Sequence, residues 1–191
     1  MGEPFFSIGH SNRPLDDFIA LLRPNGVLRV ADVRNVPRSR ANPQFNKETF
    51  AAALAEVGIA YEHIPSLGGL RARDKTGLAP EVNGFWQNQS FHNYADHALS
   101  PAFRAGLDRL IELGRTERCA YMCAEAVWWQ CHRRIITDYL LASGLDVFHI
   151  VSGAVPEPAR MTPEAQPYGE ALAYPAVQMG LPGFPTEFTP E

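Results

Sequence analysis

Short apolar runs alternate with segments of helical periodicity along most of this chain, and this alternation restricts the fold more than any other feature of the sequence. Between the first two runs, for example, apolar side chains recur at Leu15, Phe18, Ile19 and Leu22, which is the spacing of one helical face. Strands that alternate with helices form βαβ units. We therefore predict an α/β protein, a three-layer sandwich around a mainly parallel sheet of about five strands. The candidate strands are the runs at 4–9, 27–33, 60–65, 118–124 and 146–151.

The C-terminal part of the chain differs from the rest in composition, because eight of the chain's prolines follow residue 152. A length of 191 residues suits one domain with a decorated end. We predict an α/β domain over 1–151. Over 152–191 we predict an extended, proline-rich C-terminal arm, which packs on that domain or trails from it and forms one short hairpin near 160–177.

Charge and hydropathy exclude several classes of protein. The formal net charge is −4, so the whole surface does not attract polyanions, and any phosphate contact must come from a local arginine cluster. No apolar run approaches the roughly 20 residues that span a bilayer, and the first residues lack the basic and apolar regions of a signal peptide. We expect a cytoplasmic protein with no membrane partner.

Cysteine usage supports an intracellular setting. The three cysteines, Cys119, Cys123 and Cys131, lie in one short segment, which is not the pattern of a secreted disulfide framework. Packing, metal binding or thiol chemistry remain as their roles. Cys119 falls inside a candidate strand, and we expect it in the core.

Polar residues that could bind a ligand or take part in catalysis lie where several of the candidate strands end. His10 follows the first strand, Asp32 and Arg34 close the second, and Cys123 and Glu125 close the fourth. In an open parallel sheet, ligands bind just beyond the carboxyl ends of the strands. We therefore expect a single functional site at this edge of the sheet.

Four motifs hold these polar residues, namely SIGHS at 7–11, DVRNVPRSR at 32–40, GIAYEHIPSLGG at 58–69, and CAE at 123–125 followed after five residues by CHR at 131–133. This ordered set resembles the bacterial and archaeal family known as domain of unknown function 488. The resemblance covers roughly residues 4–151. It implies a Rossmann-like α/β fold and brings no established reaction.

The residues of the site suggest roles, each with a structural alternative. Glu125 is the best candidate for general acid–base catalysis, followed by His10 and His132; alternatively, Glu125 orients Arg34 or caps loop amides. Cys131 stands at a predicted helix start, where the helix dipole and the neighbouring cations favour a thiolate; alternatively, it packs against the helix. Arg34 offers forked donors to a phosphate, or else pairs with Asp32.

The leading interpretation is an intracellular enzyme that acts on a phosphate-bearing substrate, which is either a small molecule, such as a nucleotide, or a nucleic acid. We assign no cofactor and no metal to it. Paired glycines in the third motif allow a close backbone approach to the ligand. The expected catalytic residues are Glu125, Cys123, Cys131 and His10. The expected substrate-binding residues are Ser11, Asp32, Arg34, Arg38, Ser39, Gly68, Gly69, His132 and Arg133.

Two other interpretations remain open. One is a non-catalytic nucleic-acid-binding module that uses basic residues and tryptophans, including Trp128 and Trp129, as a stacking platform. Its basic residues would be Arg38, Arg40, Arg71, Arg73 and Lys75. The other is a structural metal site at Cys123, Cys131 and His132, to which His10 could add the fourth ligand that such a site needs. Against it stands the expectation that the side chains of adjacent cysteine and histidine residues diverge.

Overall fold

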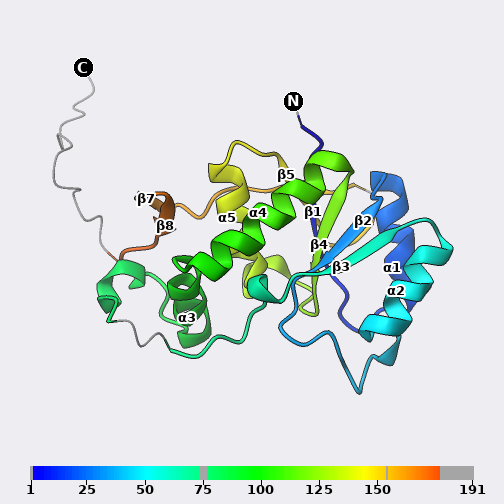
Figure 1. The fold of residues 1–191 in the computed structure, drawn as a ribbon, viewed down its shortest axis with the longest axis horizontal. Coiled ribbons are helices and arrows are strands. Elements are labelled where there is room, and N and C mark those ends of the chain that lie inside the picture. The colour runs from blue at the N-terminus through cyan, green and yellow to red at the C-terminus, as the bar shows by residue number, and fades with distance from the viewer. Residues whose placement is uncertain (1, 74–76, 154, 177–191) are drawn as a thin grey trace.

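The structure is a computed structural model that describes residues 2–73, 77–153 and 155–176, and it confirms the α/β fold. One sheet runs in the order β3-β2-β4-β1-β5-β6 (Figure 1). Neighbouring strands from β3 to β5 pair in parallel, and β6 pairs with β5 in the antiparallel sense. The strands are β1 (Phe5–Gly9), β2 (Arg29–Asp32), β3 (Ala60–His63), β4 (Cys119–Cys123), β5 (Val147–Ile150) and β6 (Glu157–Pro158).

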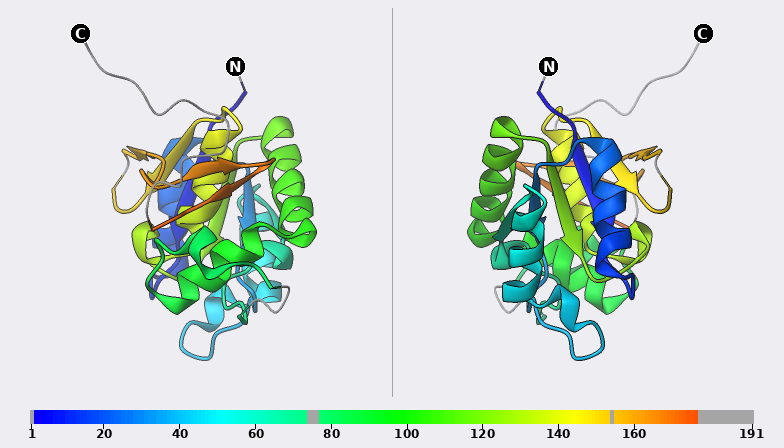
Figure 2. Two further views of the ribbon diagram at one scale, coloured as in Figure 1. Left: turned by 90° about the vertical axis from the view of Figure 1, so that its left-hand side faces the viewer. Right: turned by 90° about the vertical axis from the view of Figure 1, so that its right-hand side faces the viewer.

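Helices cover both faces of this sheet, which gives the three predicted layers. Helices α1 (Leu15–Leu22) and α2 (Lys47–Glu56) lie on one face, as the right-hand view of Figure 2 shows. Helices α3 (Gln89–Ala98), α4 (Pro101–Thr116) and α5 (Arg133–Ala142) lie on the other. Across the described ranges, no helix combines the length and the apolar character needed to cross a membrane.

The strands have no solvent-facing side because their successive side chains point alternately into two hydrophobic cores, one on each face of the sheet. In β1, Phe5 packs with α3, α4 and α5, whereas Phe6 and Ile8 pack with α1 and α2. In β4, Cys119, Tyr121 and Cys123 belong to the first core, and Ala120 and Met122 belong to the second. A parallel sheet covered on both sides has this pattern. The alternation directs the Cys123 side chain toward α5.

The segment after β5 adds to the fold in two places. Its first part supplies β6, a two-residue strand that the sequence did not predict because it is too short to show periodicity. Its second part forms the expected hairpin from β7 (Gln166–Tyr168) and β8 (Ala171–Ala173). Tyr174 is buried and its hydroxyl donates to Asp138 on α5, so this part packs on the domain. Pro182, Pro185 and Pro190 of the expected arm lie outside the described residues.

The carboxyl ends of β1, β2 and β4 meet at one edge, where the chain leaves no space for side chains at some positions. A Cβ atom on Gly9 would lie 1.9 Å from the carbonyl oxygen of Glu125. Beyond the strands, the amides of His10 and Ser11 donate to the carbonyls of Cys123 and Ala124. These contacts fix the segments after β1 and β4 against each other, and the predicted site residues His10, Ser11 and Glu125 lie on these segments.

Candidate functional site

A cavity of about 730 Å³ opens at this edge of the sheet. We refer to it as the edge pocket. All the site residues predicted from the sequence line it except Asp32, Gly68 and Arg133, which lie behind its wall. The predicted residues that line it are His10, Ser11, Arg34, Arg38, Ser39, Gly69, Cys123, Glu125, Cys131 and His132.

A buried ion pair supports the side of the pocket formed by the loop after β2. The Arg34 guanidinium donates from Nε and Nη2 to both carboxylate oxygens of Asp32, at 2.6 to 3.1 Å. Its Nη2 also donates to the carbonyl of Phe45 at 2.8 Å, and Tyr61 donates its hydroxyl to Asp32 at 2.7 Å. The Arg34–Asp32 pairing, raised above as the alternative to anion binding, is therefore present. Only Nη1 of Arg34 remains for other contacts.

His10 is locked beside this ion pair. Its Nδ1 lies 2.7 Å from the carbonyl of Ser11 and must donate to it, so Nε2 accepts from Nη1 of Arg34 at 3.3 Å. The ring stacks on Phe45 with centroids 4.2 Å apart. Burial lowers the pKa of His10 to about 4, and the positive charge of Arg34 adds to this effect. A neutral ring with both nitrogens engaged positions Arg34. The exposed carboxylate of Glu125 lines the pocket and accepts from the amide of Val127 at 3.5 Å, which is the amide-capping contact raised as an alternative above.

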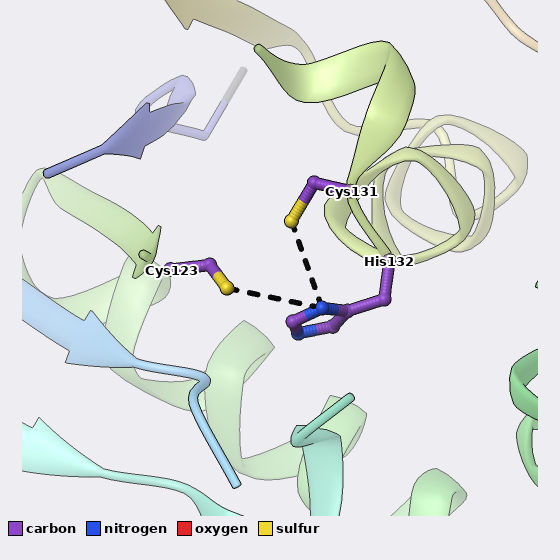
Figure 3. Close-up of side chains that lie close together, drawn as sticks. All are labelled: Cys123, Cys131 and His132. Atoms are coloured by element: carbon purple, nitrogen blue, oxygen red, sulfur yellow. Dashed lines mark hydrogen bonds between the residues drawn. The ribbon is translucent and has the colours of Figure 1, made fainter. Parts of the chain in front are cut away.

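Another part of the pocket lining is a cluster of two thiols and an imidazole (Figure 3). Cys123 ends β4, Cys131 follows the short 3-10 helix Trp128–Gln130, and His132 directly precedes α5. The Nδ1 atom of His132 lies 3.6 Å from Sγ of Cys131 and 3.9 Å from Sγ of Cys123. We refer to these three side chains as the Cys–His cluster.

The convergence of Cys131 and His132 corrects the expectation that adjacent side chains point apart. Cys131 is extended, with φ −121° and ψ 147°, whereas His132 has helical angles of −55° and −18°. The change of backbone conformation between them turns both side chains toward Cys123. On its other side the imidazole is fixed, because Nε2 donates to the carbonyl of Val33 at 2.9 Å.

Arg133 lies behind the cluster and is 1% exposed. Its guanidinium donates to Sγ of Cys131 at 3.3 Å, to Oγ of Ser7 at 3.0 Å and to the carbonyl of Glu125 at 2.6 Å. It thereby joins α5 to β1 and to the segment after β4. The structure places its side chain among protein groups behind the pocket wall.

The two cysteines of the cluster differ in acidity. Burial opposes ionisation of Cys131, but the hydrogen bond from Cys123 and the nearby positive charge of Arg133 outweigh it and hold the pKa of Cys131 well below its usual range. The hydrogen bond to Cys131, together with burial, raises the pKa of Cys123. Both pKa shifts favour ionisation of Cys131 over ionisation of Cys123. Cys119 lies in the core, where burial raises its pKa to about 12.

The paired glycines serve close contacts within the protein. A Cβ atom on Gly68 would lie 2.6 Å from Cα of Asn35, and one on Gly69 would lie 2.8 Å from Nδ1 of His132. Gly68 thus lets two loops touch, and Gly69 keeps the space beside the imidazole free. The glycine pair was expected to admit a ligand, and the contacts formed here are with Asn35 and His132.

Several lining residues were not predicted from the sequence. Phe91 and Tyr94 on α3 form an aromatic part of the wall, with the Tyr94 ring 4.9 Å from that of His132. The helical spacing of residues 91 and 94 was visible, but nothing local showed that α3 folds across the sheet edge. None of the three tryptophans is among the described residues that line the pocket. Trp86 is buried beside Tyr174, and Trp128 stacks on His149.

Comparison with known proteins gives one family and no individual relative. The family model described as "Domain of unknown function DUF488" matches residues 14–140, which is more than half of the chain. Neither the curated proteins nor the solved structures contain a significant match.

The Asp32–Arg34 pair gives a first prediction. Replacing Asp32 by Asn leaves the buried guanidinium without its counter-charge, which lowers the free energy of unfolding by about 3–5 kcal/mol. Chemical denaturation measures this change. The matched control is Glu62→Gln, which removes ion pairs with Arg29 and with the exposed Arg109 and is expected to change stability much less, because solvent screens surface ion pairs. Equal effects of the two substitutions would contradict the importance of the buried pair.

A buried histidine outside the pocket gives a second prediction. His149 on β5 is 1% exposed, stacks on Trp128 at 4.2 Å, and has no hydrogen-bond partner for either ring nitrogen among the described residues. Burial, and then the charge of Arg133, lower its pKa to about 4. Between this value and about 6.5, the unfolded chain binds a proton that the folded chain does not. Stability is therefore full above pH 6.5 and decreases as the pH falls toward 4.

The variant His149→Phe keeps an aromatic ring against Trp128 and removes the titration. We expect the pH dependence of its unfolding free energy to be shallower than that of the wild type by about 1 kcal/mol per pH unit between pH 6 and 4.5. Urea denaturation at several pH values measures both slopes. Parallel slopes for the two proteins would show that His149 is not held neutral.

Proposed function

We propose that this chain, which belongs to the DUF488 family, is an enzyme that acts on a phosphate-bearing small molecule of nucleotide size in the edge pocket. The observation that carries the proposal is that one cavity joins an aromatic wall, a polar wall and a reactive Cys–His cluster. A volume of about 730 Å³ lies within the range of small-molecule sites, which is roughly 300–1,000 Å³.

The aromatic wall supports binding of a planar group such as a base. Phe91 is partly exposed to the pocket, Tyr94 closes the wall behind it, and the exposed side chain of Leu70 lies on the same lining. Apolar and aromatic side chains provide most of the contact area in small-molecule sites, and a few polar groups orient the ligand. A nucleotide combines both kinds of surface.

Arg38 supports binding of a phosphate. It is exposed, it lines the pocket, and it takes part in none of the ion pairs formed among the described residues. The charge of Arg34 is balanced by Asp32, so Arg38 is the cation free to meet an anion. Its loop is shaped by Ser39, whose amide donates to Asn46 at 2.7 Å and whose hydroxyl accepts from the amide of Asn42 at 3.0 Å.

Glu125 supports proton transfer during the reaction. Its carboxylate is exposed and lines the pocket, while its backbone is fixed by Arg133 and by the close approach of Gly9. An acid or base on a fixed backbone at the rim can reach a bound substrate. Together, Arg38 binds the anion, the aromatic wall binds the base, and Glu125 transfers the proton.

A small molecule is favoured over a nucleic acid. Arg71, one of the basic residues considered for nucleic-acid binding, donates to the carbonyls of Gly68, Pro65 and Ser66 and so supports its own loop. Lys75 lies outside the described residues. The cavity itself, rather than a basic surface, is the feature that a ligand would match.

Ligand binding tests this function. We expect nucleoside monophosphates to raise the melting temperature in a thermal-shift screen, since a ligand at a hundred times its Kd adds about 2.7 kcal/mol of stability. Arg38→Ala should weaken nucleotide binding about tenfold or more, because it removes a charge-assisted contact to the phosphate. Arg40→Ala is the matched control, since Arg40 is exposed two residues away and does not line the pocket; its affinity should equal that of the wild type.

The screen includes nucleosides, inorganic phosphate and short oligonucleotides beside the nucleotides. Nucleosides that bind as tightly as nucleotides, or an Arg38→Ala variant with wild-type affinity, would refute phosphate recognition. Binding of oligonucleotides alone would favour the nucleic-acid-binding module. Mass spectrometry of incubated nucleotides then tests catalysis, with product expected from the wild type and none from Glu125→Gln.

A further inference from the structure

The Cys–His cluster has the arrangement of a metal site. The Sγ atoms of Cys123 and Cys131 and a ring nitrogen of His132 all lie within 4.8 Å of one another, and the three side chains line the edge pocket. We propose that they bind a zinc ion whose fourth coordination position faces the pocket. The site rests on the geometry of these side chains, whereas its use in catalysis rests on the function proposed above.

The distances fit zinc coordination. A tetrahedral zinc ion with bonds of about 2.3 Å to sulfur and about 2.0–2.1 Å to nitrogen separates a sulfur ligand from a nitrogen ligand by about 3.6 Å. The two sulfur–nitrogen distances here are 3.6 and 3.9 Å. Figure 3 shows both thiols and the imidazole directed toward one point between β4 and the start of α5. The two sulfur–nitrogen distances are thus close to those around a bound zinc ion.

The imidazole presents the correct nitrogen. Nε2 of His132 faces the carbonyl of Val33 at 2.9 Å, and a carbonyl only accepts, so Nε2 carries the proton. Nδ1 therefore has its lone pair directed at the two sulfurs. Metal-binding histidines in general donate their other ring N–H to a carbonyl or a carboxylate, which fixes the ring and its tautomer.

The surroundings fit a thiolate-bound cation. The buried guanidinium of Arg133 donates to Sγ of Cys131, an arrangement in which that sulfur accepts and does not donate. Two thiolates balance the charge of a zinc ion, so the site with Arg133 carries a net positive charge beside a pocket suited to an anion. Gly69 leaves space next to Nδ1 of His132, where a larger residue would crowd the ion.

The types of ligand atom favour zinc, and the number of protein ligands favours an open coordination position. Thiolate and imidazole ligands in a tetrahedral arrangement select zinc over magnesium or calcium, which prefer oxygen. Within the described part of the chain, no fourth histidine, cysteine or carboxylate belongs to the group. Structural zinc sites are closed by four protein ligands, while catalytic sites hold three and leave one position to water or substrate. The geometry thus favours a catalytic site over the structural one considered from the sequence.

Metal content tests the proposal. We expect full-length protein, purified without chelator from zinc-supplemented cells, to hold about one zinc ion per chain by elemental mass spectrometry. Cys131→Ser and His132→Ala should lose it. Cys119→Ser is the matched control, because Cys119 is a buried cysteine of the same strand outside the cluster, and it should keep the zinc. Circular dichroism of each variant separates loss of zinc from loss of fold.

Cobalt substitution tests the open position on the wild-type protein itself. Cobalt added to zinc-free protein should produce a thiolate-to-cobalt charge-transfer band and the visible bands of a tetrahedral ion. Imidazole, a small ligand, should shift those visible bands by occupying the fourth position. Folded wild-type protein that takes up neither zinc nor cobalt would overturn the site, and visible bands insensitive to imidazole would overturn its open position.

The two proposals fail separately. Stoichiometric zinc without nucleotide binding would refute the proposed function and leave the metal site standing. Nucleotide binding by a protein that takes up neither metal would refute the metal site alone.

Discussion

The buried guanidinium of Arg133 is the interaction on which the rest of the site depends. Three of its hydrogen bonds reach three separate elements, at Ser7 on β1, at the carbonyl of Glu125 after β4, and at Cys131 before α5. A charge 1% exposed to solvent must be compensated within the protein, and the sulfur of Cys131 is the group able to do so. One buried cation therefore fixes the backbone of Glu125 and favours the thiolate state of Cys131. The fold and the chemistry of the pocket are linked through this contact.

The two sides of the sheet edge have different tasks. On the side of α2, the Asp32–Arg34 pair and His10 form a closed network in which nearly every donor and acceptor has a partner. On the side of α5, the two sulfurs and a ring nitrogen converge within 4.8 Å of one another and are held by contacts among themselves and with Arg133. A satisfied polar network is rigid, whereas convergent thiol and imidazole groups can exchange their mutual contacts for a ligand. The first group supports the pocket, and the second is where chemistry is expected.

Local patterns predicted most of the fold and much of the site, and long-range contacts account for the rest. The alternation of apolar runs and helical faces predicted β1 to β5 and the helices between them, and the motifs at the strand ends predicted half of the residues that line the pocket. Arg133 was expected to bind substrate, because a sequence shows it only as one cation beside Arg134; its burial depends on Ser7, far away in the chain. Tyr94 was missed because only the packing of α3 brings it to His132, and the tight turn between Cys131 and His132 has no signature in residue type.

X-ray absorption at the zinc edge of the zinc-loaded protein tests the central claim most directly, because it reports the atoms bound to the ion. The account predicts two sulfur ligands at about 2.3 Å and light-atom ligands at about 2.0–2.1 Å, of which one is an imidazole and one is exchangeable. Adding a ligand that enters the pocket should change the exchangeable light atom and leave the sulfur shell as it is. A spectrum with no sulfur ligand, or with a shell that no added ligand alters, would contradict an open zinc site in the edge pocket.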